Sequence, residues 1–456
     1  MSELDDAIAR EVLALLQRYG REATSFQILE PGLKYWFDGD AVIGYGDLDG
    51  AWVSAGEPVC DPARLPEVAQ HFVEAAARAG KRARFFHVSE DFAQRSGCRS
   101  THVGELPVWD PSAWDATVKA SRSLREQIKR PRPKGVSARL VDPRQMADEG
   151  DPIRQQCDLV VRDWLAERGM GELKFMVRLH PYGFPHERRY VVAERAGRVI
   201  GFAVAIPVYG RKGWFIEDLL RDPSAPNGTV ELLIDTLMRA FAEEGSRYAT
   251  LGLAPLAGKV RPILAFTRNY TSRLYNFPGV RSFKEKLRPA RWEPVYLAYP
   301  RGEFGVLAMR DVLAAFAPGG LIRFGLETLV HQRTLATFLL ALLLVPWTIA
   351  LALIDTATWF PSAGIQTAWT TFDVLLIVLM GLLVVRWRAR LAALVVVLTT
   401  LDATLTTLQV LFWNIWTART PLAWWVVLLG CTGPLLAATF FWSTRLVAMQ
   451  GRRMRV

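Results

Sequence analysis

An acid and a base stand three residues apart in WFIEDLLRDPSAPNGTVELLIDTLMRAF, the stretch from 214 to 241. Asp218 and Arg221 end an apolar run typical of a strand, and a polar turn at 222–228 separates them from a helical pattern. A carboxylate there can accept a proton or bind an ammonium group, and a guanidinium can hold a phosphate through two parallel hydrogen bonds. The simpler interpretation is a salt bridge within a loop. The surrounding elements must show whether the two residues form a site or only such a salt bridge.

Two segments of the chain share one order of predicted elements. Each has a strand, a turn containing proline, a helix stopped by glycine and a second strand. These strands and helices fall at 51–58, 67–79 and 83–89 in one segment, and at 214–220, 230–244 and 247–253 in the other. The order predicts two copies of one α/β unit rather than one large sheet.

Three strands, separated by the turns RAGR and YGRKG, are predicted over 188–220, so they lead into the second copy. Antiparallel strands before a strand–helix–strand unit are the plan of the Gcn5-related N-acetyltransferase fold, in which splayed strands and a helix N-terminus make a slot for an acyl donor. The glycine-rich pyrophosphate loop of that fold is missing, since 222–228 contains two prolines and one glycine. We expect this turn to be a poor cradle for coenzyme A.

Seven segments, in order, resemble the cytoplasmic synthase domain of the phosphatidylglycerol lysyltransferases, also called multiple peptide resistance factors. They are RYGREATSFQIL (18–29), GYGDLDGAWVSAGEPVCDP (44–62), FFHVSEDF (85–92), SLREQIKRPRPKGV (123–136), EDLLRDPSAPNGTVELLI (217–234), LGLAPLAG (251–258) and LYNFPGVRSFKEKLRPARWEPVYLAYP (274–300). The last is the most specific, because Asn-Phe, Lys-x-Lys, Trp-Glu-Pro and Tyr-Leu follow one another over a short span. Leu220 replaces the methionine of the family's Asp-Leu-Met-Arg motif.

This resemblance implies a fold of two tandem acetyltransferase-like units. It also implies transfer of an aminoacyl group from aminoacyl-tRNA to a hydroxyl of a membrane lipid, either phosphatidylglycerol or another glycerolipid, with no cofactor. It makes catalytic candidates of Asp218, Arg221, Lys284 and Lys286. On a strand the two lysines would share a face and could meet one anionic substrate, although a solvated strand edge is the alternative.

Further substrate-binding candidates lie outside that set. Glu57 falls in the turn of the first copy and Asn276 in the Asn-Phe pair, while Arg125, Lys129 and Arg130 belong to the basic segment 121–139. This segment can bind tRNA or acidic lipid, and a charge run can also be a solvated face. The net charge of the whole chain, +10, equally favours an anionic partner.

Four apolar stretches, each about one bilayer span long, follow residue 333. They are 334–354, 367–385, 391–416 and 422–442. The hairpin RWRAR at 386–390 and the tail are rich in arginine, whereas the other two connections are nearly uncharged. The positive-inside rule therefore predicts a multi-pass inner (plasma) membrane protein whose amino-terminal domain and carboxy terminus are cytoplasmic. The acidic first ten residues lack the apolar run of a signal peptide.

Two aspartates fall within these stretches, and acids at such positions are functional candidates. Asp373 is expected near the start of the second stretch, where it could lie at the membrane interface. Asp402, surrounded by threonines, could serve helix packing or contact a lipid headgroup. The best-known family members place a many-span flippase before the synthase, so lipid flipping is not implied for four spans that follow it.

Cysteine and histidine spacing predicts neither a disulfide framework nor a metal site, because the four cysteines are far apart and the six histidines form no ligand motif. Two other functions stay open: an acyltransferase dependent on acyl-CoA or acyl carrier protein, and a non-catalytic membrane-tethered RNA- or lipid-binding module. Six regions are expected: a first acetyltransferase-like unit at 1–120, a basic linker at 121–140, a second unit with the active site at 141–302, an amphipathic connection at 303–333, the four transmembrane helices at 334–445 and a basic tail at 446–456.

Overall fold

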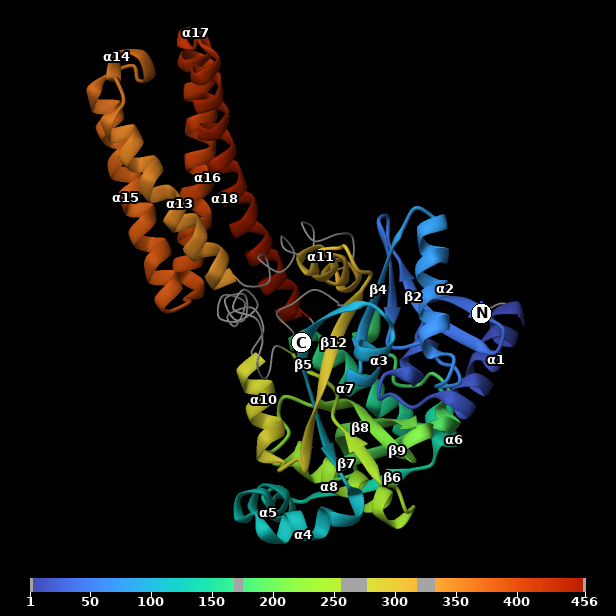
Figure 1. The fold of residues 1–456 in the computed structure, drawn as a ribbon. Helices are drawn as coiled ribbons and strands as arrows, with labels where there is room; N and C mark the ends of the chain where they lie inside the picture. The colour runs from blue at the N-terminus through green and yellow to red at the C-terminus, as the bar shows by residue number, and fades with distance from the viewer. Residues whose placement is uncertain (1–2, 168–174, 256–276, 318–332, 454–456) are drawn as a thin grey trace. The chain divides into compact units, whose positions relative to one another are not determined.

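The computed structural model describes residues 3–167, 175–255, 277–317 and 333–453. The chain forms two compact units, one of residues 1–168 and 172–321 and one of residues 169–171 and 322–456. We call the first the α/β unit and the second the helical unit (Figure 1).

The first half of the α/β unit follows the predicted repeat. Its elements are β1 (Lys34–Asp38), β2 (Ala41–Asp47), β3 (Ala51–Ala55), α2 (Leu65–Arg78) and β4 (Arg82–Val88). The first three strands are antiparallel, and α2 crosses over to make β4 parallel to β3. Helix α2 forms because Leu65, Val68, Ala69, Phe72 and Ala76 recur at helical spacing and make one buried face.

The second half repeats the same plan. It comprises β6 (Val136–Val141), β7 (Arg189–Arg195), β8 (Arg198–Val208), β9 (Gly213–Arg221), α8 (Thr229–Glu243) and β10 (Tyr248–Thr250). Strands β7, β8 and β9 are antiparallel, and α8 crosses over to a parallel pairing between β9 and β10. The predicted internal repeat is therefore confirmed in both its order and its strand directions.

The two halves are joined into one sheet by an exchange of strands, so the prediction of separate units rather than one large sheet is wrong. Strand β12 (Arg291–Tyr299) lies between β4 and β5 (Arg99–Trp109), and β5 also pairs with β10. Each half thus supplies the strand that flanks the other, and the result is a twelve-stranded sheet in the order β1-β2-β3-β4-β12-β5-β10-β9-β8-β7-β6, with β11 (Ala254–Pro255) paired to β5.

A buried ion-pair network holds α11 (Gly305–Phe316) against the first half of the sheet. The guanidinium of Arg84, with none of its side chain exposed, donates from Nε to Oδ2 of Asp311 at 3.1 Å and also contacts Glu303. Arg82, on the same strand, donates to Oδ1 of Asp311 at 3.0 Å. A buried guanidinium needs such partners because its desolvation is otherwise costly.

The helical unit consists of four long apolar helices, as predicted. They are α13 (Arg333–Leu353), α15 (Ala363–Val385), α16 (Ala389–Gln409), which continues through the π-helical η7 (Val410–Asn414) into α17 (Ile415–Thr417), and α18 (Pro421–Arg453). Each contains a segment long and apolar enough to cross a membrane. Asp373 is not near a helix end as expected, because α15 begins four residues earlier than the predicted span and the aspartate is buried near its middle.

The network around Asp311 gives a test of the α/β unit. Residues 1–321, produced alone, should fold cooperatively, and Asp311→Ala should lower the free energy of unfolding by about 3–5 kcal/mol because Arg84 keeps its buried charge and loses a partner. Asp115→Ala, which removes an exposed partner of Arg239, should change it by less than about 1 kcal/mol. Urea unfolding of the three proteins measures both effects; equal losses would show that Asp311 is not a buried anchor.

Candidate functional site

Strands β9 and β10 pair only over the first part of β9 and then diverge. Only Gly213–Phe215 pairs with β10, and the chain after β10 turns away so that Ala254 and Pro255 pair with β5. At the point of divergence β9 carries a bulge, since Ala205 faces Ile216 and Val204 faces Asp218, leaving Glu217 as the extra residue. A bulge re-aims side chains and is common beside functional sites.

The bulged residue, Glu217, forms a buried ion pair. Its Oε2 accepts from Nη1 of Arg188 at 2.6 Å and its Oε1 accepts from Nε2 of Gln27 at 2.8 Å. Arg188 is 4% exposed and also donates to the carbonyl oxygen of Gly183, while Gln27 donates a second hydrogen bond to that of Met176. The pair is therefore held by neighbours on several segments, as a buried charge requires.

A second carboxyl, that of Glu30, lies against Glu217. Burial and then the charge of Glu217 raise the pKa of Glu30 to about 10, although Arg188 acts in the opposite direction. Glu30 therefore holds its proton at neutral pH, because two unprotonated carboxylates cannot share one buried site. Its Oε2 has no hydrogen-bond partner among the described residues.

The sequence prediction missed this cluster of Gln27, Glu30, Arg188 and Glu217. The available signal was the pair of adjacent acids, Glu217 and Asp218, in an otherwise apolar strand. Adjacent residues on a regular strand point to opposite faces, so two acids there require either solvent or a bulge.

Asp218 and Arg221 lie on opposite faces of β9, because three residues separate opposite faces of a strand. Leu220, on the same face as Asp218, packs into the core that includes α7 (Pro152–Glu167), and Leu219 packs on the side of α8. The exposed Arg221 donates from Nη1 to the carbonyl oxygen of Ala225 at 3.2 Å. The two residues therefore do not form the loop salt bridge considered from the sequence.

The turn between β9 and α8 uses its amide groups internally. Oδ1 of Asp222 accepts from the amide nitrogen and the hydroxyl of Ser224 at 2.7 and 2.6 Å, and the amide nitrogen of Thr229 donates to Pro226. Gly228 has φ +97°, and a Cβ there would lie 2.2 Å from the carbonyl oxygen of Gln127, so only glycine fits. A carboxylate thus occupies the place where a pyrophosphate would need free amides.

Lys284 and Lys286 lie on a helix, α10 (Phe277–Lys286), and the prediction that they share a strand face is wrong. Residues two apart on a helix point roughly 200° apart. Lys284 is 7% exposed, and its Nζ donates to the carbonyl oxygens of Gly252 and Leu253 at 2.8 and 2.9 Å, whereas Lys286 is exposed. Burial lowers the pKa of Lys284 to about 7, so a neutral amine is accessible near neutral pH.

His87, near the end of β4, is a candidate site residue that sequence reasoning missed. Its backbone has φ +65°, a conformation that is uncommon outside glycine, and Nδ1 lies 3.4 Å from Oγ1 of Thr24. Burial, helped by the charge of Lys284, lowers the pKa of His87 to about 4 and outweighs a backbone hydrogen bond that favours the charged form. His87 is thus neutral at pH 7 and near enough to Lys284 to sense its charge.

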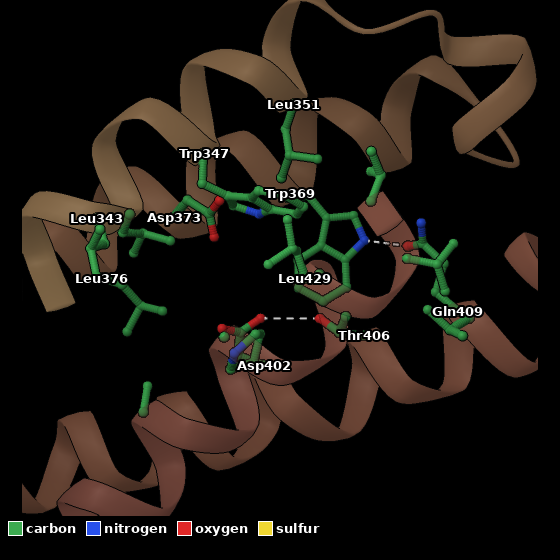
Figure 2. Close-up of a pocket in the computed structure, with 18 of the residues that line it drawn as sticks. Leu343, Trp347, Leu351, Trp369, Asp373, Leu376, Asp402, Thr406, Gln409 and Leu429 are labelled. Carbon is green, nitrogen blue, oxygen red and sulfur yellow. Dashed lines mark hydrogen bonds between the residues drawn. The ribbon is translucent and has the colours of Figure 1, made fainter. Parts of the chain in front are cut away.

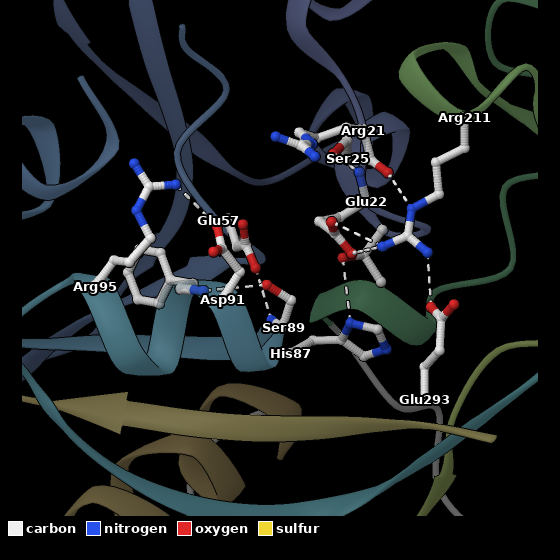
Figure 3. A network of polar contacts seen from close by, with 12 residues as sticks. Arg21, Glu22, Ser25, Glu57, His87, Ser89, Asp91, Arg95, Arg211 and Glu293 are labelled. Atoms are coloured by element: carbon white, nitrogen blue, oxygen red, sulfur yellow. Dashed lines mark hydrogen bonds and ion pairs between the residues drawn. The ribbon is translucent and has the colours of Figure 1, made fainter. Parts of the chain in front are cut away.

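Figure 3 shows the polar network around His87. Arg211 links the two halves, because Nη2 contacts Glu22 at 3.0 Å and Nη1 contacts Glu293 of β12 at 2.6 Å. The predicted substrate ligand Glu57 accepts from the amide nitrogen of Ser89 at 2.6 Å, and burial raises its pKa to about 7. Glu57 therefore holds the chain just before α3 (Glu90–Arg95).

Three of the remaining predicted residues belong to the basic segment 121–139. Arg125, on α5 (Arg122–Lys129), donates to the carbonyl oxygen of Lys119 at 2.6 Å, whereas Lys129 and Arg130 are exposed. Asn276 lies outside the described residues.

Among the described residues, Asp38, Glu67 and His71 have metal-ligand types within reach of one another. The guanidinium of Arg64 already lies 3.4 Å from Asp38 and 3.7 Å from Glu67, so a cation is present at that point of the surface. We assign no metal to this group.

The protonated state of Glu30 can be tested by pH. The folded chain keeps this proton up to about pH 10, whereas the unfolded chain releases it near 4.5, so unfolding releases a proton and stability falls as pH rises between those values. Glu30→Gln removes the effect, and its free energy of unfolding should gain on the wild type by up to about 1.4 kcal/mol per pH unit from pH 5 to 8. Glu11→Gln, an exposed control on α1 (Glu3–Tyr19), should show a constant difference; the same constancy in Glu30→Gln would mean that Glu30 is ionised.

Solved structures share the fold of the α/β unit. The C-terminal domain of a protein assigned as a lysylphosphatidylglycerol synthetase, from Agrobacterium fabrum, superimposes over its whole length on 70% of this chain with a TM-score of 0.60 and 26% identity. L-PGS from Bacillus licheniformis gives a TM-score of 0.58 over 67% of this chain and 95% of its own, with 22% identity. The predicted class, tandem acetyltransferase-like units followed by four apolar helices, is confirmed.

Curated relatives have similar sequences over the same region. Phosphatidylglycerol lysyltransferase of Bacillus subtilis is 25% identical over 310 residues, which are 65% of this chain and 35% of that protein. The lysylphosphatidylglycerol biosynthesis bifunctional protein LysX of Nocardia farcinica is 27% identical over 312 residues, which are 63% of this chain and 26% of that protein. The chain thus spans about a third or less of these relatives. The family described as "Phosphatidylglycerol lysyltransferase, C-terminal" matches residues 13–299, well over half of the 456 residues, and the chain belongs to that family.

Proposed function

We propose that this chain is a membrane-bound aminoacyltransferase that moves an aminoacyl group from aminoacyl-tRNA to a hydroxyl of phosphatidylglycerol or another glycerolipid. Membership of the lysyltransferase family supports the reaction class. The observation that carries the proposal is Lys284, a desolvated amine beside the neutral His87, close to where the chain leaves β10.

The reaction needs a base and groups that stabilise the charges of the substrates and of the intermediate. A lipid hydroxyl must lose a proton as its oxygen attacks the ester carbonyl carbon of the aminoacyl-tRNA, and the ribose oxygen of the tRNA leaves when the tetrahedral intermediate collapses. Lys284, with a pKa of about 7, can accept that proton at neutral pH. Asp218 can bind the α-ammonium group of the amino acid, and the fork of the exposed Arg221 suits a phosphate of the lipid or of the tRNA.

The turn that follows β9 argues against coenzyme A as donor. Two of its residues are prolines, the amides of Ser224 and Thr229 are already bonded, and Asp222 adds a negative charge where a pyrophosphate would lie. A non-catalytic binding module is disfavoured for a different reason. Among the described residues, the buried Lys284 has carbonyl partners and no acid, so burying its amine has a high free-energy cost. A module that only binds a ligand has no use for the neutral amine.

The basic surface supports an anionic substrate beside this turn. The carbonyl oxygen of Gln127 on α5 packs against Gly228, so the exposed Lys129 and Arg130 lie near the start of α8. Such charges attract the phosphate backbone of a nucleic acid, and they also attract acidic lipid headgroups. We assign this surface to tRNA, with acidic lipid as the alternative.

Substitutions in the site test the proposal. Asp218→Asn and Arg221→Lys should each cut the initial rate of aminoacyl-lipid formation from labelled aminoacyl-tRNA by roughly 10²-fold, the scale of a lost acid–base or electrostatic contact. Lys284→Met should do the same and should also abolish the rise in rate through about pH 7, because the neutral amine forms as the pH rises past that value.

Lys286→Met is the matched control. The sequence makes Lys286 a catalytic candidate, but on α10 it is exposed and points roughly 200° away from Lys284, so we leave it out of the proposed base site. It should keep the rate and the pH profile, and thermal melts should show that all four variants are folded. Ribonuclease should stop the reaction, and acyl-CoA should not replace the tRNA. A folded Lys284→Met protein with an unchanged pH profile would remove Lys284 as the base.

The orientation of the chain follows from charge. Arg386 and Arg388 lie between the second and third spans, and Arg390 is the second residue of the third. We place this arginine-rich hairpin, the α/β unit and the carboxy terminus on the cytoplasmic side of the inner membrane, where aminoacyl-tRNA is made. Reporters active only in the cytoplasm or only outside it, fused after Arg390, measure this directly. Activity of the cytoplasmic reporter is expected, and export of the hairpin would contradict both the orientation and access to tRNA.

A further inference from the structure

The helical unit contains a cavity of about 340 Å³, a volume within the range of small-molecule sites. Most of its lining is apolar, and Trp347 and Trp369 contribute large surfaces (Figure 2). Leucines that line it, including Leu343, Leu429 and Leu436, are also exposed on the surface of the unit. The cavity is therefore open towards the side of the helices that contacts hydrocarbon.

Two carboxylates belong to the same lining. Asp373 lies one residue from the middle of the span Ala363–Val385, and Asp402 lies one residue from the middle of the span Ala389–Thr417. They are 3% and 6% exposed, and Figure 2 shows both in the cavity, between Leu343 and Leu376 on one side and Trp369 and Gln409 on the other. Placing an acidic side chain near the middle of a membrane span has a high free-energy cost, so such a residue indicates a functional site.

Among the described residues of the unit, neither carboxylate has a cationic partner. Asp373 accepts one hydrogen bond from Thr348 at 3.2 Å, and Asp402 accepts one from Thr406 at 3.3 Å. No Lys, Arg or His occurs in 334–385, 391–418 or 420–444. Four oxygen atoms therefore share two neutral donors, and an ionised carboxylate at this depth needs a cation supplied from outside.

The local backbone also departs from a regular helix at this point. A π-helical turn spans Val410–Asn414, directly after Gln409, and Gln409, Val410 and Asn414 all line the cavity. Gln409 accepts from the indole of Trp369, and the amide of Asn414 donates to the carbonyl oxygen of Trp359. Single π turns are frequent at functional sites, and this one closes the end of the cavity with polar groups that are already bonded.

We propose that this cavity binds the primary ammonium group of a membrane lipid between Asp373 and Asp402, with the lipid's hydrocarbon leaving past the exposed leucines. The volume admits a headgroup and the start of a chain, and the apolar lining matches that chain. An ammonium group offers three donors to the unfilled carboxylate oxygens. Phosphatidylethanolamine and an aminoacylated phosphatidylglycerol both carry this group, whereas phosphatidylglycerol does not.

Lipid retention by the full chain tests the site without tRNA, so its outcome is separate from that of the aminoacyltransfer assay. The protein is purified from mixed vesicles of phosphatidylglycerol, phosphatidylethanolamine and lysyl-phosphatidylglycerol with identical chains, and bound lipids are counted by native mass spectrometry. An ammonium lipid should be retained about tenfold over phosphatidylglycerol. The ethanolamine and lysyl arms identify which source the site prefers.

Asp373→Asn combined with Asp402→Asn should bring this preference to within about twofold. The control is Asp355→Asn, an exposed acid of the same unit outside the lining, and it should behave as the wild type. If the double variant fails to fold, Ala437→Leu keeps both carboxylates while adding hydrocarbon at a buried lining position, and it should lower the retained ammonium lipid. Equal retention of all three lipids by the wild type, an unchanged preference in a folded double variant, or full retention by Ala437→Leu would overturn the proposal.

Discussion

The buried ion pair between Arg188 and Glu217 is the contact on which the arrangement of the α/β unit depends. Removing both charges from water is costly, and the cost is offset only if every remaining donor and acceptor is bonded. Gln27 bonds one oxygen of Glu217 and the protonated Glu30 lies against it, and both come from the opening segment of the chain. The pair thus fixes the bulge in β9, aims Asp218 and fastens residues near the start of the chain to the second half of the sheet.

The exchange of β5 and β12 explains how distant residues meet. Because β12 inserts beside β4, the helix that precedes it, α10, is brought to the end of β4, and this places the charge of Lys284 near His87. The same insertion lets Glu293 of β12 share Arg211 with Glu22. A simple tandem repeat with two separate sheets would leave these groups on different bodies, so the exchanged strands are what make one site from two repeats.

Local patterns predicted the repeat, its parallel crossovers and the four spans, because helical and strand periodicity are properties of short windows. They did not predict the exchange, which depends on pairing between residues about 190 apart. The Lys-x-Lys alternation predicts a strand for Lys284, whereas Phe283 and Leu287, four apart, pack in one core as on a helix. Hydropathy alone puts Asp373 too near an end of its span, because it does not show that Ser362 caps the helix by accepting from Ile365.

Some charged side chains inside the two units have a counter-charge and others do not. This difference separates groups that hold the fold together from groups that can meet a ligand's charge. The buried Arg84 and Arg188 and the partly buried Arg211 are each matched by carboxylates, as expected of groups whose task is to hold elements together. Among the described residues, Lys284 has carbonyl oxygens as partners and no acid, and Asp373 and Asp402 have hydroxyls and no base. Burying a group without its counter-charge is unfavourable in the protein alone, and it becomes favourable when a substrate supplies a proton, an ammonium group or an anion. The unmatched groups are therefore where each unit has room for a ligand's charge.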